Sequence, residues 1–149
     1  MSEEPGFIVK LYDKKYEKLS IVELVKAPVA AISGVSESDA EDLKAAFGIE
    51  TVEDFATNRY VKIAQGISCF SECSGQILDK EFESDEFVDL ANQPVSAISG
   101  VSEKDAVLLK NAFGIGSISE LANNKYVSIA QSTVALADLV QYLKSIGVA

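Results

Sequence analysis

Apolar residues recur along most of this chain at spacings of three and four positions, which is the period of an amphipathic helix. Two stretches, 37–47 and 103–113, show this pattern clearly, and further apolar residues follow each of them at helical spacing. A strand-like pattern of useful length occurs only in Phe7–Tyr12. The pattern therefore predicts an all-α protein. The expected core positions are Ala40, Leu43, Phe47, Ile49, Val52 and Phe55, and then Ala106, Leu109, Phe113, Ile115, Ile118 and Leu121.

Helix starts are marked by a serine or threonine that is followed three positions later by an acid, the signature of a capping box. These pairs are Ser20 with Glu23, Ser36 with Asp39, Thr51 with Asp54, Ser102 with Asp105, and Ser117 with Glu120. Gly48 and Gly114 follow the apolar stripes directly and suit left-handed helix ends. We therefore expect helices over 21–26, 37–47 and 52–57, a repetition of the last two in the second half, and longer helices starting near Tyr60 and Tyr126.

The chain repeats itself at an offset of 66 positions. Residues 28–65 align without a gap to residues 94–131, and about two thirds of the aligned positions are identical. The repeat predicts two similar helical units in tandem. It also provides an internal control, because a residue present in only one copy is not required by a fold that both copies share.

The segment ISGVSESDAEDLKAAFGIETVEDFA resembles the helix-hairpin-helix (SAM-like) family, and it is most similar to its tandem, degenerate, uncharacterised members. The similarity covers about 28–57 and 94–123, and Ser117 replaces the expected threonine in the second copy. The resemblance implies two tandem helix-hairpin-helix-like units, at 20–78 and 86–149, preceded by an arm at 1–19 and joined by an acidic junction at 79–85. The matching positions are Ile32, Gly34, Val35, Ala40, Leu43, Gly48, Ile49, Thr51 and Val52, and then Ile98, Gly100, Val101, Ala106, Leu109, Gly114 and Ile115.

The hairpins themselves depart from the family members that bind DNA. By this resemblance, the DNA-binding members have a glycine-apolar-glycine hairpin. Its second glycine lets the backbone approach a phosphate, and a basic residue usually follows. The hairpins here read Gly34, Val35 and Ser36, then Gly100, Val101 and Ser102, with acids in the following turn. Carboxylates favour the positive end of a helix and repel phosphate. We therefore expect these hairpins to be degenerate, that is, to keep the turn but not the phosphate-binding site.

Charge points in the same direction. The formal net charge is −10, and residues 67–92 carry seven acids and one lysine. Nucleic-acid binding needs a basic footprint, which this composition lacks. The acidic junction has two interpretations: a solvated connection between helices, or a docking surface for a basic partner.

The residue types needed for common catalytic chemistry are missing. The chain has no histidine, and it has no Gly-rich phosphate loop followed by lysine. The sequence therefore predicts no enzyme activity, no cofactor and no metal. Cys69 and Cys73 correspond in the repeat to Ala135 and Leu139, which predicts that both thiols pack in the core.

Other recurring residues have structural interpretations. Tyr60 and Tyr126 are expected in the core, and Asn58 and Asn124 are expected to cap the last helix of each copy. Gln65 and Gln131 leave three alternatives open: a hydrogen bond to backbone, a bond between the two glutamines, or a bond to a partner.

The sequence favours a protein–protein interaction module, a scaffold or accessory subunit; the alternative is a sequence-independent nucleic-acid module that uses the hairpins. The expected partner is a protein or larger complex, with a basic partner matching the acidic residues, and a homo-oligomer is a further option. The start of the chain lacks a secretory signal and no segment is long and apolar enough to span a bilayer, so we expect a cytoplasmic protein. The apolar arm either pads the first unit or docks on another subunit. The predicted partner-binding residues are Phe7, Ile8, Val9, Leu11, Tyr12, Asp79, Glu81, Glu83, Asp85 and Glu86.

Overall fold

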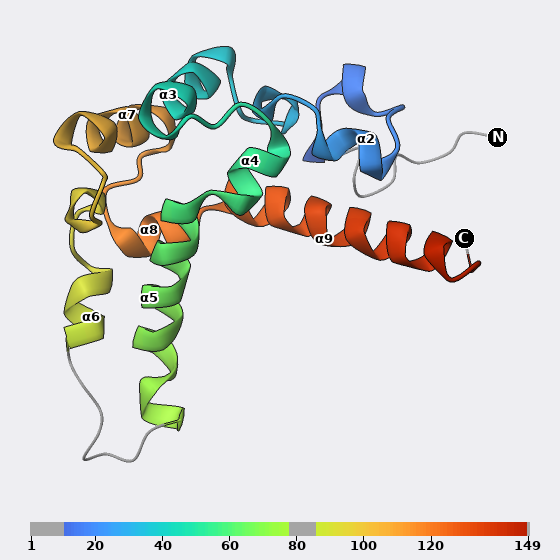
Figure 1. Cartoon of the computed structure of the whole chain (residues 1–149). Coiled ribbons are helices and arrows are strands. Elements are labelled where there is room, and N and C mark those ends of the chain that lie inside the picture. The colour runs from blue at the N-terminus through green and yellow to red at the C-terminus, as the bar shows by residue number, and fades with distance from the viewer. Residues whose placement is uncertain (1–10, 78–85, 149) are drawn as a thin grey trace.

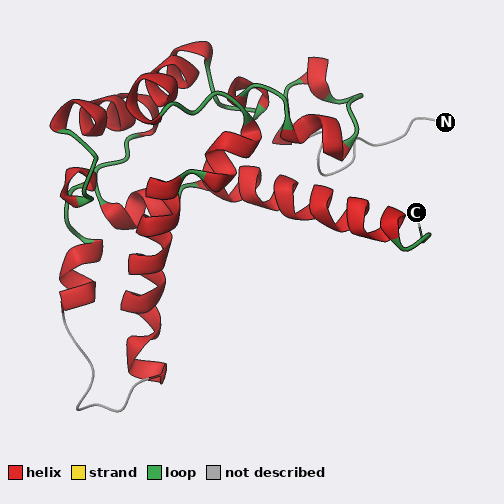
Figure 2. Ribbon diagram, viewed as in Figure 1, coloured by secondary structure: helices red, strands yellow, loops and turns green. Residues whose placement is uncertain are grey.

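The protein is helical, as the apolar pattern predicts. The computed structural model describes residues 11–77 and 86–148, and side chains are described outside 72–77 and 86–88. Within these ranges helices are joined by short loops and there is no strand (Figure 2). The prediction of an all-α protein is confirmed.

Apart from η1, the two halves of the chain form matching series of elements. The first series is η1 (Lys14–Tyr16), α2 (Ile21–Val25), η2 (Val29–Ala31), α3 (Glu37–Phe47), α4 (Val52–Thr57) and α5 (Arg59–Ile77). The second is α6 (Glu86–Ala91), η4 (Val95–Ala97), α7 (Glu103–Phe113), α8 (Ile118–Ala122) and α9 (Lys125–Ser145). The boundaries of α3 and α7 differ by the same 66 positions as the sequence repeat.

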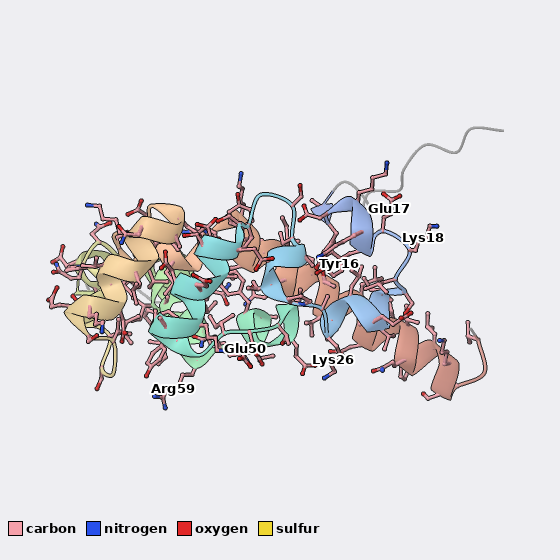
Figure 3. The ribbon with its side chains drawn as sticks, turned by 90° about the horizontal axis from the view of Figure 1, so that it is seen from above. Tyr16, Glu17, Lys18, Lys26, Glu50 and Arg59 are labelled. Carbon is pink, nitrogen blue, oxygen red and sulfur yellow. The ribbon has the colours of Figure 1, made fainter. Side chains whose placement is uncertain are left out.

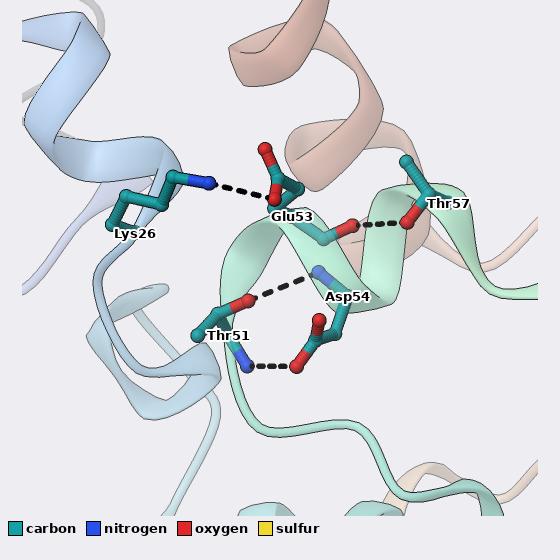
Figure 4. A network of polar contacts seen from close by, with 5 residues as sticks. All are labelled: Lys26, Thr51, Glu53, Asp54 and Thr57. Carbon is teal, nitrogen blue, oxygen red and sulfur yellow. Dashed lines mark hydrogen bonds and ion pairs between the residues drawn. The ribbon is translucent and has the colours of Figure 1, made fainter.

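Capping residues determine where these helices begin and end. Complete capping boxes form at Ser20, Ser36, Thr51 and Ser102. Figure 4 shows the box of α4, in which the Thr51 hydroxyl accepts a bond from the Asp54 amide and the Asp54 carboxylate accepts one from the Thr51 amide. At α8 the prediction is half right. The Ser117 hydroxyl accepts from the Glu120 amide, but the Glu120 carboxylate accepts from the Gly116 amide at 3.1 Å instead of closing the box.

The long helices cross between the two halves of the chain. Helix α5 packs against α6 and α8 of the second half, whereas α9 packs against α2 and α4 of the first half. Helices α3 and α7 lie side by side (Figure 1). Their contact is the third between the two halves, after those of α5 and α9. Each half therefore contributes its last helix to the other half.

This exchange produces one shared hydrophobic core. A single cluster of buried residues includes Leu43, Val52 and Phe55 from the first half and Leu109 and Leu121 from the second. The rings of Phe55 and Phe113 stack across the two halves with centroids 6.3 Å apart. Neither half buries its apolar residues alone. The domain boundaries given by the repeat stay a prediction.

Residues 11–13, the first that the structure describes, form hydrogen bonds with both halves of the chain. Tyr12 forms an isolated antiparallel bridge with Ile32, supported by bonds from the Asp13 amide to the Ala31 carbonyl and from the Ser33 amide to the Leu11 carbonyl, both 2.8 Å. The Tyr12 side chain is 3 % exposed, and its hydroxyl bonds the Thr133 hydroxyl of α9 at 2.6 Å. Burial raises the pKa of the Tyr12 phenol, so the hydroxyl keeps its proton across the physiological range.

The outer surface carries few ion pairs among the described residues. Lys26 pairs with Glu53 at 2.8 Å and Lys44 with Glu50 at 2.9 Å, and all four side chains are largely in solvent. Seen from above, Lys26, Glu50 and Arg59 lie along one edge of the molecule (Figure 3). Because water screens exposed pairs, these contribute little to stability.

Candidate functional site

The predicted hairpins are occupied by their own side chains. In the first, the Ser36 amide donates to the Asp39 carboxylate at 3.1 Å and the Asp39 amide donates to the Ser36 hydroxyl at 3.0 Å. Ser102 and Asp105 repeat this arrangement at 3.2 and 3.0 Å. A phosphate approaching either helix start would have to displace a carboxylate that already accepts a hydrogen bond there.

The glycine of each hairpin lies against the ring end of a tyrosine from the other half. Gly34 and Gly100 have φ of +98° and +97°, in the region that favours glycine. A Cβ atom at Gly100 would lie 2.7 Å from the Tyr60 hydroxyl oxygen, and one at Gly34 would lie 2.6 Å from that of Tyr126. The Tyr126 hydroxyl also donates to the Gly34 carbonyl at 3.4 Å. Each hairpin is therefore a contact point between the two halves, although Gly34 and Gly100 themselves stay exposed.

Both tyrosines are held in place by their neighbours. As predicted, Asn58 caps α5, where its side-chain oxygen accepts from the amides of Tyr60 and Val61 at 2.9 and 3.2 Å. The Tyr60 ring packs on Phe47 with centroids 4.8 Å apart, and the Arg59 guanidinium lies 4.7 Å from its centroid. The corresponding residues of the second half, Asn124, Phe113 and Lys125, surround Tyr126 in the same way. Tyr60 is buried, as expected, and Tyr126 is half-buried.

Gln65 and Gln131 meet at the centre of this arrangement. Each amide nitrogen donates to the side-chain oxygen of the other glutamine at 2.8 Å. Each also reaches a backbone carbonyl of the opposite half: Gln65 that of Ala122 at 3.5 Å, and Gln131 that of Ala56 at 3.3 Å. Two of the alternatives left open by the sequence are therefore combined, since the glutamines bind both each other and backbone.

We expect Gln131→Ala to lower the free energy of unfolding by about 1–2 kcal/mol, because the amide of Gln65 loses its partner in a half-buried position. The double variant Gln65→Ala, Gln131→Ala should lose less free energy of unfolding than the sum of the two single variants. The difference, the coupling energy, should be about 1 kcal/mol. Urea unfolding of the two single variants and the double variant measures this coupling. Gln141→Ala, at an exposed position of α9, is the control and should stay within about 0.5 kcal/mol of the parent chain. Additive losses would contradict the paired geometry.

The predicted partner-binding residues are only partly described. Phe7, Ile8 and Val9, and likewise Asp79, Glu81, Glu83 and Asp85, lie outside the described residues. Glu86 is the first residue of α6, and its side chain is not described. Leu11 packs against the core and Tyr12 is buried in it, so these two residues pad the chain's own core instead of forming an exposed docking surface.

The prediction that Cys69 packs in the core is wrong. Its side chain is exposed on α5, and so is its counterpart Ala135 on α9. The inference from Ala135 failed because alanine is small enough to occur commonly on the solvent-exposed side of a helix, so it does not indicate burial. The side chain of Cys73 lies outside the described part. No group of three His, Cys, Asp or Glu side chains within the described ranges could hold a metal ion.

An apolar stripe that was not among the predicted site residues runs along the distal half of α9. Leu136, Leu139, Tyr142 and Ile146 are 39, 50, 59 and 53 % exposed. At 100° per residue Leu136, Leu139 and Tyr142 of α9 fall within an arc of about 120°, and Ile146 follows directly after the helix. The core-facing side of the same helix is formed by Val127, Ala130, Thr133 and Ala137. The signal was available in the sequence as an excess of apolar residues within Val134–Ile146, a segment that the two copies do not share.

This stripe does not make α9 a membrane segment. None of the helices in the described residues combines the length and the apolar character that a bilayer crossing requires.

Comparisons of the chain with family models, curated proteins and solved structures found no match.

Proposed function

We propose that this chain is a non-enzymatic protein-interaction module, a scaffold or accessory subunit, built from two degenerate helix-hairpin-helix units. The apolar stripe on α9, formed by Leu136, Leu139, Tyr142 and Ile146, is the observation that supports this proposal. Clustered apolar side chains left in water are characteristic of protein-binding surfaces, because burying them against a partner is the main source of association energy.

The stripe matches one type of partner segment in particular. A helical surface with apolar side chains every three or four residues fits an amphipathic helix that offers the same spacing. The acidic residues of the junction would favour a basic partner, because complementary charge speeds encounter and sets orientation more than it raises affinity.

The alternative, a nucleic-acid module, is disfavoured by the hairpins. The serine and aspartate side chains already bond the helix-start amides, and a tyrosine hydroxyl lies close to each hairpin glycine. Phosphate binding would therefore have to overcome both this occupancy and a net charge of −10.

We expect Leu139→Lys to weaken partner binding at least about tenfold, because it places a charge in the middle of the apolar stripe. Val107→Lys is the matched control, since Val107 is an equally accessible apolar residue (57 % exposed) on the distant helix α7. Both variants should keep the helical circular dichroism and the melting temperature of the parent chain. Proteins captured from native extract on the parent chain and the two variants are compared quantitatively, and the selected partner is then titrated in purified form.

A supporting result is a protein that the parent chain and Val107→Lys retain and Leu139→Lys loses. Equal retention by all three baits would refute the stripe as the site. Recovery of nucleic acid in a strongly salt-dependent manner would favour the alternative instead.

A further inference from the structure

We propose that the apolar stripe of α9 binds the same stripe of a second copy of this chain, with the two helices antiparallel and related by a twofold axis. The inference rests on the proposed function, because it names a partner for the surface that the proposed function gives to protein binding. Four features of α9 support it: the side on which the stripe lies, its spacing, its charge and the way in which the helix ends.

The stripe lies on the side of α9 that faces away from the core. Helix α9 packs against α2 and α4, and its buried residues include Thr133 and Ala137. At 100° per residue, Leu139 is rotated by about 160° from Ala137 around the helix axis. Leu139 is 50 % exposed. A second helix can therefore approach the stripe without displacing the helices that bury the opposite side.

The spacing of the apolar residues is the same in both directions along the helix. Leu136, Leu139, the half-buried Leu143 and Ile146 follow one another at intervals of three, four and three positions, the alternation of a coiled-coil seam. An antiparallel pair can place its twofold axis at the level of Gln141. Leu136 then faces Ile146 of the second copy, and Leu139 likewise faces its Leu143. A twofold contact requires such a self-complementary surface, since both copies present the same residues.

The charge of this surface also favours a second copy. Asp138 and Lys144 are the only charged residues between Tyr126 and Ile146, and they are rotated by about 100° and 140° from Leu139. The stripe is therefore uncharged, although the chain carries a net charge of −10. Two copies can join their stripes without placing like charges opposite one another. Salt screens the repulsion between the remaining surfaces of the two chains, so it should strengthen the contact.

The end of the helix holds the stripe in one conformation. The Val148 amide donates to the Leu143 carbonyl at 2.8 Å, and the Gly147 amide donates to the Lys144 carbonyl at 3.1 Å. With Gly147 at a φ of +80°, these are the two bonds of a Schellman motif. The last turn of α9 is therefore already closed in the single chain, and Leu143 loses little conformational freedom when a second copy binds.

The contact is short, so the dimer should be weak and reversible. From Leu136 to Ile146 the stripe runs about 15 Å along the helix axis. Permanent dimers usually bury more than about 2,000 Å². A second copy therefore protects the apolar stripe from water, and a protein with a larger contact can replace it there.

Sedimentation equilibrium of the full chain, from about 1 µM to 1 mM, tests the proposal. A reducing agent is present, so that the exposed Cys69 does not link two chains. We expect the weight-average mass to rise with concentration from the 15.9 kDa of one chain toward twice that value. Leu139→Lys should weaken the association at least about tenfold. Gln141→Lys is the matched control, because it makes the same change in charge at an exposed position of α9 about 160° away from Leu139, and it should stay within about twofold of the parent chain.

A complementary pair of variants tests the antiparallel register. Position 139 of one copy faces position 143 of the other, so Leu139→Lys mixed with Leu143→Glu places opposite charges together. The mixture should associate at least about fivefold more tightly than either variant alone. A mixture that associates no more tightly would overturn the proposed pairing.

Three further results would overturn the proposal: a chain that stays monomeric up to about 1 mM, a dimer that Leu139→Lys leaves unchanged, or a dimer that weakens as salt is raised. The proposed function would survive each of them if the parent chain still captured another protein that Leu139→Lys loses. Conversely, if the stripe forms the dimer and the parent chain captures no other protein, only the proposed scaffold function fails.

Discussion

Gly100→Ala is expected to lower the free energy of unfolding by about 3 kcal/mol. Two effects combine in this loss: a φ of +97° strains any residue with a Cβ, and the added methyl would lie 2.7 Å from the Tyr60 hydroxyl. Tyr60 cannot easily move away, since it is buried, packs on Phe47 and carries Arg59 against its ring. Urea-induced unfolding followed by far-ultraviolet circular dichroism measures the loss.

The chain contains its own control for this prediction. Gly114 also has a positive φ, +70°, but beyond its immediate chain neighbours no atom lies within 4 Å of the position that a Cβ would take there, so Gly114→Ala should cost only about 1 kcal/mol. Combining Gly100→Ala with Tyr60→Phe removes the closest atom and should recover about 1 kcal/mol of the loss. Equal losses for the two alanine variants would mean that Tyr60 does not lie against the hairpin.

Phe55→Ala should cost about 3–5 kcal/mol and lower the stability of the whole chain in one step. Phe55 is 1 % exposed and stacks with Phe113 of the other half, so the cavity opens in the core that both halves share. Differential scanning calorimetry should therefore record a single transition, shifted to lower temperature, for the variant as for the parent chain.

The matching surface variant is Val107→Ala, which should leave the transition within about 0.5 kcal/mol of its original stability because Val107 is exposed. Two resolved transitions, of which Phe55→Ala shifts only one, would show that the halves unfold independently and would contradict the shared core.

Local signals in the sequence predicted the helices well. The capping pair of Thr51 and Asp54 begins α4 as expected, and Gly48 ends α3 in the left-handed conformation that its position suggested. Such signals act within one helical turn, so the sequence alone is sufficient to recognise them. For Gln65 the sequence left open a bond to backbone, to Gln131 or to a partner, and the structure combines the first two.

The exchange of α5 and α9 could not be predicted from the same sequence. Because the two copies are so similar, the apolar side of either long helix fits its own half and the other half equally well, and no local pattern distinguishes the two. The contact between Tyr60 and Gly100 was missed for this reason. The prediction that Cys69 is buried was wrong for a different reason. The repeat shows which residue types occur at two equivalent positions, but it does not show whether either position is exposed to solvent.

The bond between Tyr12 and Thr133 also bears on how the protein is made. The two residues are 121 positions apart, so at about 5–20 residues per second a ribosome needs roughly 6–24 s to produce the second after the first. During this interval the first half lacks the helix that completes its core. Nascent chains should therefore be sensitive to proteases and dependent on chaperones until α9 has emerged, and messages truncated before Lys125 should yield insoluble products.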